Sequence, residues 1–120
     1  MSDTATPWST PGATPQDIED AAAILRGVVH ETELSSSARL CEHTGVEVLL
    51  KREDQQRCRS FKVRGAFARM SALSPVERER GLVCASAGNH AQGVAYACQT
   101  LGVHGTIYLP SNTPRQKRNR

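Results

Sequence analysis

Two short apolar runs on either side of an amphipathic run most constrain the fold of this chain. Residues 81–87 (GLVCASA) and 105–110 (GTIYLP) have the composition of buried strands. The intervening residues 91–102 (AQGVAYACQTLG) have helical spacing and end on Gly102, a residue type that commonly ends helices. Because two strands joined through a helix usually lie parallel in one sheet, these residues predict a right-handed βαβ unit.

The residues before this unit show the same alternation of strand and helix. Residues 46–54 (VEVLLKRED) predict a buried strand that ends in charged residues. Ser60 is suited to cap a helix from Phe61 to about Leu73, which Pro75 cannot continue. The order strand, helix, strand, helix, strand predicts an α/β fold with an open, parallel, twisted sheet and flanking helices.

Both ends of the chain carry helix signals. Residues 1–13 are rich in Ser, Thr, Pro and Gly and have no regular period, which predicts a flexible arm. Thr14, Pro15 and Asp17 then supply the cap, the first residue and an acidic group for the first turn of a helix. A Thr-Pro pair at 113–114 predicts one more helix start.

Charge and composition exclude several classes of protein. The net charge is +3, but four of the fifteen basic residues lie in the last six positions, which leaves eleven basic against twelve acidic residues elsewhere. The sequence therefore predicts no nucleic-acid partner. It opens with no secretory leader, and no apolar run approaches the ~18 residues of a membrane span. Its four cysteines form no C-x-x-C pair, so we expect reduced thiols, no metal site and a cytoplasmic location.

The loop SAGNH at 86–90 lies between a predicted strand and a predicted helix. This is the carboxyl end of a parallel strand, where open α/β sheets bind their ligands. Free backbone N–H groups and the positive end of a helix dipole suit a carboxylate or a phosphate at such a turn. The spacing matches neither common phosphate-loop motif, so a tight structural turn with Asn89 as a helix cap is an equal alternative.

Lys62 lies among apolar residues in the first turn of a predicted helix. The positive end of a helix disfavours an ammonium group and favours the neutral amine. A neutral amine is a nucleophile that can condense with a carbonyl group. The alternative is an ordinary exposed helix lysine beside Arg59 and Arg64.

Three motifs, KRED at 51–54, SFKVRGA at 60–66 and SAGNHAQGVA at 86–95, occur in a fixed order. Together they resemble the pyridoxal-phosphate-dependent threonine and serine dehydratases of the tryptophan-synthase-β-like fold class. The resemblance extends from Thr32 to Arg120. The chain is thus similar to the amino-terminal part of the threonine dehydratases, also named threonine ammonia-lyases.

Carried over residue by residue, the resemblance assigns a cofactor site. Lys62 would bind the aldehyde of pyridoxal 5'-phosphate and later move the α-proton of the substrate. Phe61 would pack beside the cofactor, and Asn89 would form a hydrogen bond with its ring hydroxyl. The substrate carboxylate would be held by the loop residues Ser86, Gly88, Asn89 and His90.

The resemblance also implies an eliminating enzyme. Val63 stands where threonine and cysteine synthases usually have an aspartate. Ala87 stands where related racemases have a serine that acts as the second proton carrier. The implied substrate is a small amino acid: L-threonine would give 2-oxobutanoate and ammonia, in isoleucine biosynthesis, and L-serine would give pyruvate. A homo-oligomer is implied for the full-length family.

The chain departs from the family pattern in several places. Family members are longer and hold the cofactor phosphate with a run of glycines, whereas no two of the nine glycines here are adjacent. Gln55, Arg57 and Cys58 also differ from the usual family residues. The resemblance implies only an incomplete part of the fold type II architecture, with residues 14–52 in its large domain and residues 53–120 in its smaller α/β domain. Two alternatives follow: the amino-terminal portion of a competent dehydratase, or a non-catalytic remnant that binds at most pyridoxal phosphate or another protein.

Overall fold

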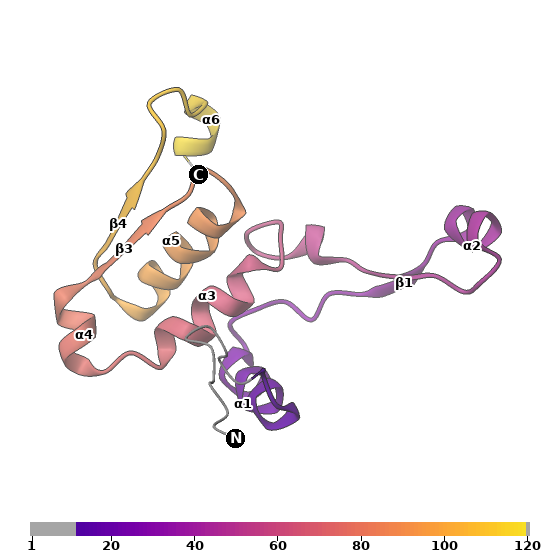
Figure 1. Cartoon of the computed structure of the whole chain (residues 1–120), viewed down its shortest axis with the longest axis horizontal. Helices are drawn as coiled ribbons and strands as arrows, with labels where there is room; N and C mark the ends of the chain where they lie inside the picture. Colours follow the sequence, from indigo (N-terminus) through magenta and orange to yellow (C-terminus); the bar gives the residue numbers. More distant parts are fainter. Residues whose placement is uncertain (1–11, 120) are drawn as a thin grey trace, which may run out of the picture.

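The computed structural model describes residues 12–119, so residues 1–11 of the predicted flexible arm lie outside the described part. Figure 1 shows a body that contains α3, α4, α5, β3 and β4, and an extension formed by β1, α2 and β2. We call this extension, residues 34–51, the hairpin arm. The elements in chain order are α1 (Pro15–Leu25), β1 (Leu34–Ser36), α2 (Ala38–Thr44), β2 (Leu49–Lys51), the 3-10 helix η1 (Glu53–Gln55), α3 (Lys62–Ser71), α4 (Pro75–Arg80), β3 (Leu82–Ala85), α5 (Asn89–Leu101), β4 (Gly105–Tyr108) and α6 (Arg115–Arg118).

The predicted βαβ unit is confirmed. β3 and β4 pair in parallel, with Cys84 opposite Ile107, and α5 connects them. Gly102 follows α5 with a φ of 66°, in the left-handed region where glycine carries no steric penalty. The loop that leads from β3 into α5 therefore lies at the carboxyl edge of the parallel pair.

The strand predicted at residues 46–54 exists as β2, but the prediction that it joins the parallel sheet is wrong. β2 pairs antiparallel with β1 instead of joining the parallel pair, and Ser35 lies opposite Leu50. Only three residues of each strand pair, and neither strand has a buried residue. A strand inside a parallel sheet is buried on both faces. Because β1 and β2 have no buried residue, they form an exposed antiparallel pair instead.

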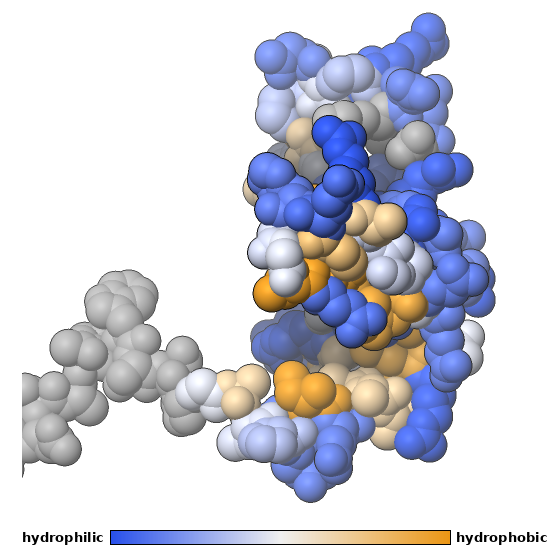
Figure 2. Space-filling view, turned by 90° about the vertical axis from the view of Figure 1, so that its right-hand side faces the viewer, coloured by the Kyte–Doolittle hydropathy of each residue, from blue (hydrophilic) through white to orange (hydrophobic). Residues whose placement is uncertain are grey.

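Large apolar side chains are exposed along the hairpin arm. Figure 2, which views the molecule from the side on which the arm extends, shows hydrophobic surface among polar side chains. α2 has no buried residue. The exposed apolar side chains of the arm are Leu34, Leu40, Val46, Leu49 and Leu50. The arm therefore has no core of its own.

The hydrophobic core joins α3 and α5 to α1 and β3. Val63, in the first turn of α3, is fully buried, so the inner side of this turn is anchored. α5 is the longest helix described, with 13 residues, and within residues 12–119 no helix is long and apolar enough to cross a membrane. The buried core residues are Leu25, Ala66, Phe67, Met70, Cys84, Val94 and Ala97.

Candidate active site

Lys62 begins α3 and its side chain is exposed. The helix starts one residue later than predicted, because Phe61 occupies the cap position with helical backbone angles. Ser60 is therefore not the cap residue itself, but its hydroxyl accepts a 3.3 Å hydrogen bond from the Lys62 N–H. Phe61 is 58% exposed, and the centre of its ring lies 4.9 Å from Lys62 Nζ.

α5 contacts the first turn of α3 at Gly93. A Cβ atom added to Gly93 would lie 3.0 Å from the carbonyl carbon and oxygen of Lys62 and 3.1 Å from the nitrogen of Val63. A side chain at this position would therefore push the two helices apart. Because α5 begins at Asn89, four residues earlier, the contact brings the start of α5 about one helical turn from the Lys62 backbone.

The SAGNH loop ends at an uncapped helix. The Ser86 N–H donates to Tyr108 O at 3.2 Å, and the Gly88 N–H donates to the Ser86 hydroxyl at 3.2 Å. Gly88, not Asn89, is the cap residue, so the predicted cap role of Asn89 is wrong by one position. No side chain of the described residues caps this helix, and Gly88, Asn89 and His90 are exposed. The first N–H groups of α5 are thus available to an anion.

Two pockets contain four of the predicted site residues, whereas Ser86 and Gly88 line neither of them. A cleft of about 680 Å³ is lined by Phe61, Lys62 and His90, together with Arg64, Arg69 and apolar side chains of α3 and β3. Asn89 lines a second pocket of about 290 Å³ with polar residues that include Arg57. The structure therefore brings the lysine, its aromatic neighbour and one loop residue to a common cleft, and places Asn89 in the more polar pocket.

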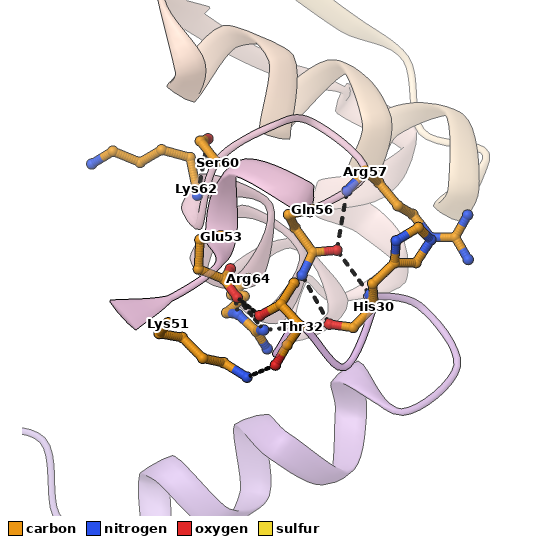
Figure 3. Close-up of polar contacts among 9 residues, drawn as sticks. All are labelled: His30, Thr32, Lys51, Glu53, Gln56, Arg57, Ser60, Lys62 and Arg64. Carbon is orange, nitrogen blue, oxygen red and sulfur yellow. Dashed lines mark hydrogen bonds and ion pairs between the residues drawn. The ribbon is translucent and has the colours of Figure 1, made fainter. Parts of the chain in front are cut away.

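An ion pair that the sequence did not single out lies behind Lys62 (Figure 3). Arg64 Nε donates to Glu53 Oε2 at 2.9 Å, and Arg64 Nη2 donates to Glu53 Oε1 at 2.7 Å. The hydroxyl of buried Thr32 donates to Glu53 Oε1 at 2.6 Å. The KRED and SFKVRGA motifs each contribute one partner, which is the only signal of this pair in the sequence.

Gln56 forms a second contact between separate segments. It is 2% exposed, and its side chain accepts from the His30 N–H at 2.8 Å and donates to His30 O at 3.0 Å. The same Oε1 accepts from the Arg57 N–H at 3.1 Å. Because a buried amide must satisfy both its oxygen and its nitrogen, Gln56 fixes the loop before α3 to the segment that follows α1.

The ion pair between Glu53 and Arg64 predicts that the folded chain loses stability at low pH. The Arg64 hydrogen bonds, followed by that of Thr32, lower the pKa of Glu53 from 4.5 to about 2. A lowered pKa adds stability that is complete above pH 4.5 and is lost as the pH falls toward 2. A fully buried pair would contribute about 3 kcal/mol; solvent near the Arg64 side chain, 33% exposed, reduces this to about 1–2 kcal/mol.

Glu53→Gln tests this prediction through urea unfolding at pH 7 and near pH 2. The free energy of unfolding of the variant should be lower than that of the unmodified chain at pH 7, and the difference should shrink near pH 2. An equal loss at both pH values would contradict the assignment.

An exposed amine beside a free helix N-terminus is suited to a carbonyl cofactor and an anionic substrate group. The sequence model of the family described as pyridoxal-phosphate dependent enzymes matches residues 25–120. The chain belongs to this family.

Relatives of this chain include threonine dehydratases. The chain is similar to the "L-threonine dehydratase biosynthetic IlvA" of Mycobacterium leprae, with 52% identity over 111 residues, which are 92% of this chain and 26% of that protein. The protein of the same name from Bacillus subtilis is 55% identical over 93 residues, which are 78% of this chain and 22% of the relative. The chain thus spans about a quarter of the length of these relatives.

Solved structures agree on the fold. The processed form of threonine deaminase isoform 2 from Solanum lycopersicum has a TM-score of 0.77 and 41% identity, covering 90% of this chain and 31% of that one. Maize serine racemase has a TM-score of 0.83 and 34% identity, covering 89% and 32%. The described residues therefore have the fold of part of a type II pyridoxal-phosphate enzyme.

The residues present fit one side of a cofactor site. Lys62 offers an exposed primary amine next to an aromatic ring and a cleft. The start of α5 offers uncapped N–H groups to an anion, and the missing Cβ of Gly93 lets these two features approach. The donor set is thus suited to an aldehyde and a carboxylate, the two groups that a pyridoxal-phosphate enzyme must place together.

Proposed function

We propose that this sequence is the part of a threonine dehydratase that carries the cofactor lysine and the carboxylate loop. The reaction is the deaminating elimination of L-threonine to 2-oxobutanoate and ammonia, a step of isoleucine biosynthesis, with L-serine as a second substrate that gives pyruvate. The contact of Gly93 with the Lys62 backbone carries the proposal, because it brings the first turn of α3 to about one helical turn from the start of α5. The identities of 52% and 55% to threonine dehydratases support the substrate.

Each site residue has a proposed role in binding or proton transfer. When bound, pyridoxal phosphate stores the negative charge that develops at the α-carbon. Lys62 would hold the cofactor through its aldehyde, and the Lys62 amine would accept the α-proton of the substrate. Phe61 packs beside the cofactor and Asn89 forms a hydrogen bond with its ring hydroxyl. The carboxylate is held by Ser86, Gly88, Asn89 and His90.

Two apolar residues separate the proposed elimination from the reactions of related synthases and racemases. Val63 is aliphatic and fully buried, so the chain has no carboxylate at the position where threonine and cysteine synthases usually have an aspartate. Ala87 has no hydroxyl and cannot return a proton to the opposite side of the α-carbon. The fold similarity to maize serine racemase does not supply this missing group, and identity is higher to the tomato threonine deaminase.

The proposal includes the wider organisation of the protein. Residues 14–52 would belong to the large domain of the complete enzyme and residues 53–120 to the smaller α/β domain. The complete enzyme would act as a cytoplasmic homo-oligomer. The alternative is a remnant without catalytic activity that binds at most pyridoxal phosphate or another protein.

A hybrid enzyme tests the proposal. Residues 25–119 of this chain replace the matching segment of the Mycobacterium leprae dehydratase, and release of 2-oxobutanoate from L-threonine is measured. The hybrid should be active, whereas the 120-residue chain alone should show little turnover because it has no glycine run to hold the cofactor phosphate. A folded but inactive hybrid would favour the non-catalytic alternative.

A further inference from the structure

Behind Lys62 lies a polar network formed by the contacts of Glu53, Arg64, Thr32 and Gln56 described above. None of these contacts is made with the Lys62 amine or with the SAGNH loop. We propose that Glu53, Arg64 and Gln56 position Lys62 by fixing the first turn of α3 relative to the loop that precedes it. This inference rests on the role proposed above for the Lys62 amine. Glu53 and Gln56 do not line the cleft and act through the backbone around Lys62. Arg64 also lines the cleft, and its positioning role acts through its two hydrogen bonds to Glu53.

Arg64 holds the side of α3 opposite Lys62. The two residues are separated by about 200° around the helix axis, so their side chains leave α3 in nearly opposite directions. Figure 3 shows Arg64 turned into the network and Lys62 extending away from it. Because Arg64 binds both oxygens of Glu53, at 2.9 and 2.7 Å, the contact resists rotation of the helix turn. This pair of hydrogen bonds, called the fork below, therefore fixes the direction in which the Lys62 side chain leaves α3.

The loop between the ion pair and Lys62 is held at its centre by Gln56. The backbone oxygen of Gln56 accepts from the Arg59 N–H at 2.7 Å. Arg59 has a φ of 52°, which a non-glycine residue adopts only where its surroundings hold it. Ser60, 7% exposed, follows and accepts from the Lys62 N–H. An unbroken series of contacts thus runs from buried Gln56 to the backbone of Lys62.

The network is sheltered enough for its geometry to persist. The side chain of Glu53 is 15% exposed, and Thr32, which also donates to it, is 8% exposed. Removing Arg64 would leave a poorly solvated carboxylate without its main partner. The loop would then have to rearrange, and the first turn of α3 would lose its fixed orientation.

Hydrogen exchange of backbone amides tests the proposal without any cofactor. In Arg64→Met, the amides of residues 62–64 should exchange about tenfold faster, because one charged hydrogen-bonded pair is lost. The amides of residues 67–71, later in the same helix, should keep their rates. Arg64→Lys, which keeps the charge but not the fork, should give an intermediate increase. The double variant Glu53→Arg with Arg64→Glu should restore most of the protection.

Arg69→Met, in the last turn of the same helix, is the matched control because it removes an arginine that contributes no fork to Glu53. It should leave exchange at residues 62–64 unchanged. A uniform increase along α3 in Arg64→Met, or no increase, would overturn the positioning role.

A second measurement separates this proposal from the proposed function. Pyridoxal phosphate is added, reduced onto the protein with borohydride, and the yield at Lys62 is measured by mass spectrometry. Arg64→Met should lower the yield about fivefold relative to Lys51, in line with its exchange rates. If Arg64→Met changes neither the yield at Lys62 nor the exchange rates, the positioning role alone is overturned. If Arg64→Met exchanges faster at residues 62–64 but even the unmodified chain never captures the cofactor at Lys62, the proposed function alone is overturned.

Discussion

Lys62→Ala is expected to abolish covalent capture of pyridoxal phosphate by the chain. The Lys62 amine is exposed at the edge of the cleft, where a cofactor aldehyde can reach it. Capture is measured by borohydride reduction followed by mass spectrometry of the modified peptides. In the hybrid dehydratase, the same change should lower the elimination rate by about 10³-fold or more, because the group that moves the α-proton is lost.

Two variants define the specificity of this result. Lys51→Ala removes another exposed lysine, in β2, and should leave capture at Lys62 intact. Lys62→Arg should fail like the alanine variant, because a guanidinium stays protonated and does not condense with the aldehyde. Capture by Lys62→Ala at the level of the unmodified chain would show that a different amine is used.

Gly93→Val is expected to destabilise the chain by about 2–3 kcal/mol, the usual cost of overpacking a close contact between helices. The added Cβ alone would lie 3.0 Å from the Lys62 backbone, and valine adds two methyl groups beyond it. Urea unfolding measures the loss. Because α3 and α5 must separate to admit the side chain, the yield of cofactor capture at Lys62 should also fall.

Gly65→Ala is the matched control for this change. Gly65 also lies within a helix, α3, but a Cβ there meets no atom within 4 Å. Alanine should therefore stabilise the chain by up to about 1 kcal/mol through its helix propensity. If Gly93→Val were as stable as Gly65→Ala, the close contact between the helices would not exist in solution.

Local signals predicted most helix and strand positions correctly. Thr14 and Asp17 form the expected capping box of α1 with Pro15 as the first helical residue. Ser74 caps α4 through the amide of Glu77, directly before Pro75, where the preceding helix was predicted to be unable to continue. These contacts span three or four residues, so their chemistry can be read from the sequence alone.

Long-range contacts were not predictable in the same way. The β1 partner of β2 lies 15 residues earlier in a segment without strand periodicity, so its pairing carried no local signal. Gln56 appeared only as a neighbour of residues that depart from the family pattern, although its side chain binds His30, 26 positions away. The roles assigned to Phe61, Lys62, Ser86, Gly88, Asn89 and His90 come from the family resemblance and remain predictions.

The contact at Gly93 has a consequence for the order of events during synthesis. Lys62 and Gly93 are far apart along the chain and meet only after α5 has packed on α3. A chain that has emerged from the ribosome no further than α3 would therefore expose Lys62 as an ordinary amine. Selective reaction with the cofactor should begin only once the βαβ unit has folded, so the rate of capture during refolding would report the docking of these two helices.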